Sequence, residues 1–144
     1  IQEINVGLID LLLNGGLLPV VNAITHDKKG QLLNTNADSI ASALATSLAG
    51  EHQVNLYFCF NKNGVLVDEK NENSIIPLIN EDIYAELRKE NVIHSGMIPK
   101  LDNAFEALKK GVSHVWIGKA ENLLLAAKGK LSGTTIERNR YDLY

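Results

Sequence analysis

Short apolar runs alternate with segments of helical periodicity along this chain, and this alternation limits its fold more than any other feature. Runs rich in β-branched and aromatic residues lie at 17–25, 54–60 and 113–117, and each is typical of a buried strand. Residues 31–33 and 133–136 suit two shorter strands. Strands that alternate with helices indicate a largely parallel sheet. The sequence therefore predicts an α/β fold of three layers, with helices on both faces of a mainly parallel sheet.

The helical segments carry start and stop signals. Apolar residues at helical spacing predict helices near 4–14, 37–49, 81–92, 97–110 and 121–128. Asn36 and Asn80 suit N-caps, and Gly111 suits the end of the fourth helix. No repeat or low-complexity tract divides the 144 residues. We therefore expect residues 1–144 to form one domain.

Composition excludes several classes of protein. A hydrophobic share of 45% and a charged share of 22% are ordinary for a globular protein and argue against disorder. The net charge of −3 provides no strong field for nucleic acid. The single cysteine, Cys59, excludes an intrachain disulfide and is expected to be a buried thiol, because it lies in an apolar run. The four histidines show no metal-ligand spacing, and no apolar stretch is long enough to cross a bilayer. A cytoplasmic protein is expected.

Ligands of open α/β sheets bind beyond the carboxyl ends of the strands, and three segments fall at such places: 34–38, 61–64 and 94–100. The last is the most informative. Gly96 permits close backbone approach, and Pro99 suits a first helical turn whose free amides favour a phosphate. Lys100 is a cation at the end of a helix where the dipole disfavours it. It is either a lysine that neutralises a phosphoryl group or a solvated surface residue.

The other two segments have ordinary alternatives. Asn34 could bind a small polar substrate and Asp38 could hold a lysine, but turn and capping chemistry also explains both residues. The segment 61–64 is either a nucleotide loop or a tight turn, and Gly64 suits both. The sequence has no Walker-type loop and no dinucleotide-binding glycine fingerprint.

Four stretches resemble, in order, segments of the N-acetylglutamate kinases of the amino-acid kinase superfamily. They are LLLNGGLLPVV at 11–21, GQLLNTNAD at 30–38, SGMIPK at 95–100 and GTTI at 133–136. The resemblance runs from about Val6 to Ile136, but it covers only the carboxy-terminal part of the family's catalytic unit. It implies the nucleotide-binding half of an amino-acid kinase, with the amino-terminal substrate domain absent. Such a half is expected to be inactive alone.

The resemblance implies ATP-dependent phosphorylation of the side-chain carboxylate of N-acetyl-L-glutamate or another N-acylglutamate, in arginine biosynthesis. Lys100 would stabilise the transition state, Asp38 would organise the catalytic lysines, and Asn34 would bind the substrate. Mg²⁺ would accompany ATP, held mainly by phosphates and water. The residues implied along the nucleotide are Asn61, Lys62, Asn63, Gly64, Val65, Leu66, Val92, Ile93, His94, Gly96 and Met97.

One departure from the family pattern leaves alternatives open. The family has an aspartate in a T-D-x-x-G-V-L pattern, where this chain has Asn61 followed by Lys62. A non-catalytic module that senses a nucleotide or an amino acid is therefore the second hypothesis. A glutamate 5-kinase, an aspartokinase or a uridylate kinase is possible within the same superfamily, and the acyl group could be larger than acetyl. Family members are commonly dimers, so a homo-oligomer is expected.

Overall fold

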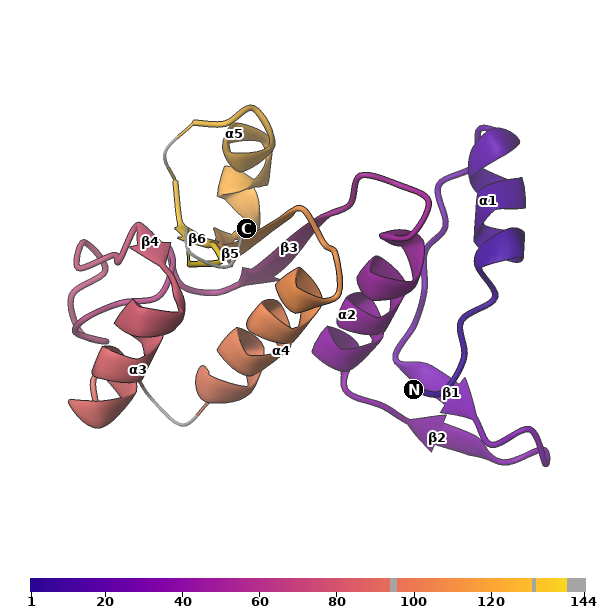
Figure 1. Ribbon diagram of the computed structural model, residues 1–144, viewed down its shortest axis with the longest axis horizontal. Helices are drawn as coiled ribbons and strands as arrows, with labels where there is room; N and C mark the ends of the chain where they lie inside the picture. The colour runs from indigo at the N-terminus through magenta and orange to yellow at the C-terminus, as the bar shows by residue number, and fades with distance from the viewer. Residues whose placement is uncertain (94–95, 131, 140–144) are drawn as a thin grey trace.

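The computed structural model describes residues 1–93, 96–130 and 132–139, and its elements largely follow the predicted alternation (Figure 1). The elements are α1 (Val6–Asn14), β1 (Ile24–His26), β2 (Leu32–Asn34), α2 (Ala37–Leu48), β3 (Asn55–Phe60), β4 (Leu78–Ile79), α3 (Glu81–Lys89), α4 (Ile98–Lys109), β5 (His114–Lys119), the short 3₁₀-helix η1 (Ala120–Asn122), α5 (Leu123–Ala127) and β6 (Thr134–Ile136). Within these ranges, no helix combines the length and apolarity needed to cross a bilayer.

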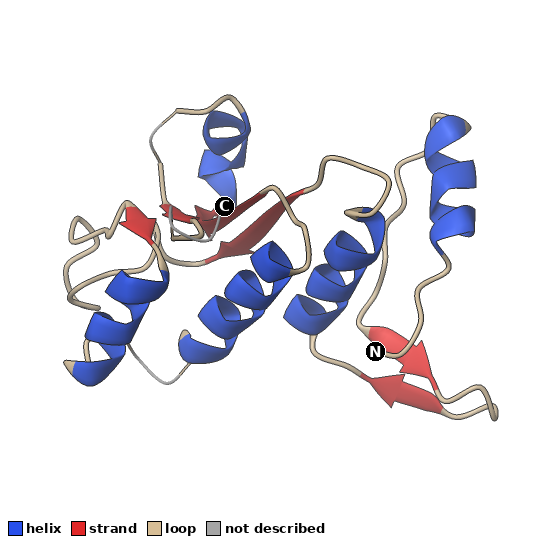
Figure 2. Cartoon of the chain, in the orientation of Figure 1, coloured by secondary structure: helices blue, strands red, loops and turns tan. Residues whose placement is uncertain are grey.

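Four strands form the central sheet in the order β3-β5-β6-β4. The pairs β3–β5 and β4–β6 are parallel, whereas β5 and β6 are antiparallel. Helices α2 and α4 cover one face, and α5 lies on the other (Figure 2). The predicted α/β class with helices on both faces is confirmed, although the sheet is mixed, because β4 and β6 run opposite to β3 and β5.

The core forms where α4 meets the sheet. Leu101, Phe105 and Leu108 share one face of α4 and are buried, as the helical spacing predicts. They belong to the same buried cluster as Val115 and Ile117 of β5. These apolar side chains pack α4 against β5, and β5 pairs with β3. The position of α4 is therefore fixed relative to β3.

The predicted capping residues hold the helix ends. The Asn36 side chain accepts a hydrogen bond from the Ser39 amide at 3.2 Å, and the Asn80 side chain accepts one from the Ile83 amide at 2.9 Å. Gly111 follows α4 with φ +101°, a left-handed conformation that favours glycine. The start of α2 is therefore fixed locally, and this is where Asp38 lies.

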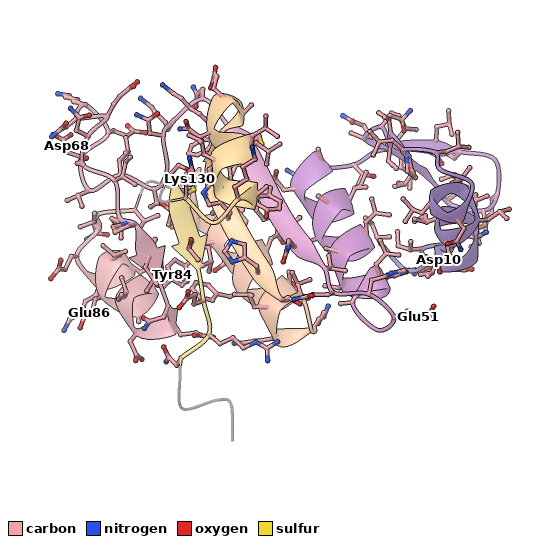
Figure 3. The ribbon with its side chains drawn as sticks, turned by 90° about the horizontal axis from the view of Figure 1, so that it is seen from above. Asp10, Glu51, Asp68, Tyr84, Glu86 and Lys130 are labelled. Carbon is pink, nitrogen blue, oxygen red and sulfur yellow. The ribbon has the colours of Figure 1, made fainter. Side chains whose placement is uncertain are left out.

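The prediction of a buried strand at 17–25 is wrong. Only its last residues join β1, which pairs with β2 in a separate hairpin. Leu18 and Val20 are 85% and 92% exposed. A buried strand needs neighbouring strands and two covered faces, and the described residues supply neither here. Helix α1 also has no buried residue, and its Asp10 contacts His52, in the turn after α2, at 2.8 Å (Figure 3 labels Asp10).

Other details of the strands also differ from the predictions. Cys59 is exposed rather than buried, because side chains alternate along β3 and the buried positions are Leu56 and Phe58. Partial desolvation raises the pKa of its thiol. After β3, Leu66 forms one isolated bridge with Ile75. Strand β4 was not predicted, because two residues are too short to show a period.

The first residue of β5 makes stability depend on pH. Burial lowers the pKa of His114, and the charge of Glu137 offsets this only in part. The unfolded chain has an ordinary histidine pKa of about 6.5, so it binds more protons than the folded chain as the pH falls through that value. The contribution of His114 is therefore present above that pH and is lost below it. We expect the urea midpoint to fall less between pH 7 and 5 in His114→Gln than in the wild type. Equal slopes in the two proteins would contradict this role.

Candidate functional site

A cleft of about 510 Å³ lies where β3 ends and α4 begins. Its size falls in the range of about 300–1,000 Å³ that is usual for ligand pockets. We call it the Lys100 cleft. It is lined by Phe60, Asn61, Lys62, Gly64, Val65, Leu66, Glu69, Ile93, Gly96, Met97 and Lys100.

The cleft gathers most of the residues predicted to lie along a nucleotide. Asn63 and Val92 do not line it. His94 lies outside the described residues. Two lining residues were not predicted. Phe60 is the last residue of β3 and could have been found from its place at the strand end, whereas Glu69 lies in a polar loop that carries no signal.

Lys100 and Asp38 form an ion pair across the two neighbouring helices. Helices α2 and α4 lie side by side (Figure 1), and each residue belongs to the first turn of its own helix. Their side chains are 21% and 26% exposed, so the pair is partly shielded from water. The Lys100 ammonium also lies 5.8 Å from the centre of the Phe58 ring, within reach of a cation–π attraction.

The helix dipoles act in opposite ways on the two charges of this pair. A carboxylate at a helix amino terminus is favoured by the dipole, and an ammonium there is disfavoured. Asp38 is thus stabilised by α2, while Lys100 is stabilised by Asp38 and Phe58 against the dipole of α4. The pair fixes a positive charge at the wall of the cleft.

The start of α4 offers backbone donors beside this charge. Met97 is the N-cap, a proline occupies the first turn, and no side chain in the described parts of the chain caps the helix. The amides of a first turn have no partner within their helix. Met97 and Gly96 line the cleft, so these donors lie at its edge. Such an arrangement suits an anion.

The loop after β3 forms the opposite wall. The Lys62 ammonium donates to the Glu69 carbonyl at 3.4 Å, and the Asn63 side chain donates to the Glu72 carbonyl at 3.3 Å. Lys119, at the end of β5, pairs with the Glu72 carboxylate at 3.2 Å. Asn63 therefore links two parts of the same loop and does not line the cleft.

Asn34 lies apart from the cleft. It is the last residue of β2, pairs with Ile24 in the hairpin and is exposed. The hairpin leads directly into α2, so only a few residues separate Asn34 from Asp38. The structure brings most of the predicted nucleotide residues together with Lys100, which pairs with Asp38, whereas the predicted substrate residue Asn34 does not line the cleft.

Comparison with known proteins gives consistent matches. The model of the amino acid kinase family matches residues 1–119. The chain is 50% identical over 129 residues to an acetylglutamate kinase of Cytophaga hutchinsonii, covering 89% of this chain and 49% of that protein. It is 42% identical over 138 residues to an acetylglutamate kinase of Phocaeicola vulgatus, covering 96% of this chain and 52% of that protein.

Among solved structures, the carbamate kinase of Giardia lamblia bound to AMP-PNP matches with a TM-score of 0.72 over 96% of this chain and 51% of that chain. Its sequence identity is 18%, so this likeness concerns the fold alone. The chain spans about half the length of the curated relatives it matches.

Proposed function

Because this chain belongs to the amino acid kinase family, we propose that it binds ATP in the Lys100 cleft and serves the phosphorylation of a carboxylate. The acceptor is the side chain of N-acetyl-L-glutamate or another N-acylglutamate, as in arginine biosynthesis. The observation that carries this proposal is the ion-paired ammonium of Lys100 at the wall of a cleft of nucleotide size, beside the free first turn of α4.

The chemistry asks for positive charge and alignment. A carboxylate that attacks a phosphoryl group must overcome repulsion between two anions, and phosphoryl transfer depends on positioning and charge neutralisation. Lys100 supplies a fixed cation, and the first-turn amides of α4 supply donors. Asp38 holds the ammonium in place through their ion pair.

The cleft is poor in metal ligands. Glu69 is the only acidic residue that lines it in the described part of the chain, and Asp38 is already paired with Lys100. Mg²⁺ prefers to keep several waters and to bind through phosphates. These residues fit an ion that arrives with ATP, whose charge would help to neutralise the phosphates.

The acceptor is proposed from the relatives, two of which are acetylglutamate kinases at 42% and 50% identity. Asn34 would bind the substrate from its place ahead of Asp38. Because the chain spans about half of these relatives, the remaining substrate groups would come from a part that it does not match. We propose that the 144 residues act as one nucleotide-binding domain of a cytoplasmic homo-oligomer and transfer no phosphate alone.

Binding and transfer can be tested separately. We expect the chain to bind Mg·AMP-PNP at one site, with a dissociation constant between about 1 μM and 1 mM, the usual span for enzyme substrates. Isothermal titration measures it. A folded chain that binds neither ATP nor AMP-PNP would overturn the proposal.

For transfer, the part of the Cytophaga hutchinsonii enzyme that this chain does not match is placed ahead of Ile1. We call this protein the fusion kinase. With ATP and N-acetylglutamate it should form an acyl phosphate, which hydroxylamine traps, while the chain alone should form none. Glutamate, aspartate and UMP as acceptors distinguish the other substrate classes.

A non-catalytic nucleotide or amino-acid sensor is the second candidate. Asn61 and Lys62 favour it, because they replace the carboxylate that the related pattern carries at this wall. Binding of AMP-PNP by the chain together with an inactive fusion kinase would support the sensor over the kinase.

A further inference from the structure

Thr134, the first residue of β6, is the only polar residue that is buried among those the structure describes, with none of its surface exposed. A buried hydroxyl without partners is costly, so its hydrogen bonds reveal its role. It accepts a hydrogen bond from the Val65 amide at 2.8 Å and donates one to the Ile76 carbonyl at 2.7 Å. One hydroxyl therefore bridges two residues that lie far from it in sequence.

Val65 and Ile76 form the base of the loop that walls the Lys100 cleft. The Ile76 amide donates to the Val65 carbonyl at 2.8 Å, and the Val67 amide donates to the Ser74 carbonyl at 2.8 Å. These hydrogen bonds join the two ends of the loop 65–76, and both ends contact the Thr134 hydroxyl. Asn61, Lys62, Gly64, Val65, Leu66 and Glu69 line the cleft from this segment and the turn before it.

Two glycines, Gly64 and Gly118, lie where the loop comes closest to the sheet. A Cβ atom on Gly64 would lie 2.7 Å from the Thr134 hydroxyl oxygen, closer than real side chains approach. A Cβ atom on Gly118 would lie 3.1 Å from the Asn63 carbonyl and 2.5 Å from the Trp116 ring. The loop thus lies directly against the ends of β5 and β6, and the absence of a side chain at Gly64 lets the Thr134 hydroxyl reach the Val65 amide.

We propose that Thr134 is a positioning residue for the nucleotide. Its hydroxyl sets the height of the Val65–Leu66 wall above the sheet, and through this wall it sets the width of the Lys100 cleft. The inference rests on the proposed function, because it assigns a nucleoside triphosphate to that cleft. Thr134 lines no part of the cleft and acts through the loop.

Two substitutions separate the hydroxyl from the shape of the side chain. Thr134→Val keeps the shape and leaves the Val65 amide and the Ile76 carbonyl without their partner, whereas Thr134→Ser keeps both hydrogen bonds. We expect Thr134→Val to weaken binding of Mg·AMP-PNP to this chain roughly tenfold, the equivalent of one hydrogen bond. Thr134→Ser should bind as the wild type does. The Val65 amide should exchange with solvent faster in the valine variant alone.

Val112→Ala is the control for an effect of lost stability on nucleotide binding. Val112 is buried in the short connection between α4 and β5, where it does not line the cleft. This variant should lose stability and keep its affinity for Mg·AMP-PNP, measured at a temperature where all four proteins are folded. The inference is overturned if Thr134→Val binds as tightly as the wild type, or if Thr134→Ser is as weak as Thr134→Val. If the wild type itself does not bind, the proposed function fails, and the inference falls with it.

Discussion

Replacing Lys100 by methionine in the fusion kinase is expected to lower kcat about 10²–10³-fold, the usual cost of removing one group that stabilises transition-state charge. Methionine keeps an apolar stem of similar length and removes the cation, which lies 5.8 Å from the centre of the Phe58 ring. Lys100→Arg restores a charge with a different shape, so a part of the rate should return. Steady-state rates at saturating ATP and acceptor measure the effect.

The control for this substitution lies at the other end of the same helix. Lys110 forms an ion pair with Glu106 and is exposed. Lys110→Met removes a paired ammonium of the same type without touching the cleft, and its kcat should match that of the wild type. If Lys100→Met also kept the wild-type rate, the kinase proposal would lose its charge-neutralising group.

Local signals were enough to predict most of the fold. Asn36 and Asn80 start helices where their side chains predict, because a cap depends only on its own neighbouring residues. The spacing of Leu101, Phe105 and Leu108 likewise identified the buried face of α4. Elements defined within a few residues are visible in a single sequence, since nothing distant changes them.

Three of the failures depend on distant partners. Residues 17–23 have the composition of a buried strand, but most of them are exposed because no described strand lies beside them. Cys59 has apolar neighbours in sequence, yet the sheet directs it away from the buried face. Strand β6 was predicted, but its antiparallel pairing with β5 follows a long connection that contains η1 and α5, so no local signal specifies it. Apolar composition alone thus predicts a strand without predicting its neighbours.

The residues of the candidate site likewise include some that local sequence predicts and some that depend on distant partners. The segment at 96–100 is locally readable, because a glycine, a proline and a misplaced cation stand at one helix start. That Asp38 lies against Lys100 could not be derived from local spacing, since 62 residues separate them; the family resemblance supplied it. The role of Thr134 was not predicted at all, because a threonine in a β-branched strand gives no sign of a distant hydrogen-bond partner.

Asp38 should matter only through Lys100, and a double-mutant cycle tests this. Asp38→Asn removes the charge that holds the ammonium and keeps the size of the side chain. A misplacement of about 1 Å can cost about 10²-fold in rate, so we expect a loss of kcat of that order in the fusion kinase. In a Lys100→Met background, where no ammonium remains to be positioned, the same substitution should add little.

The matched control is Asp82→Asn. Asp82 occupies the first turn of α3, as Asp38 occupies the first turn of α2, so both substitutions remove a carboxylate from the favourable end of a helix dipole. Asp82 does not line the Lys100 cleft, and its variant should keep the wild-type kcat. If Asp38→Asn were instead as harmful with methionine at position 100 as with lysine, Asp38 would act on the substrates directly. The ion pair would then be a by-product of two adjacent helix ends rather than the means by which the chain fixes its cation.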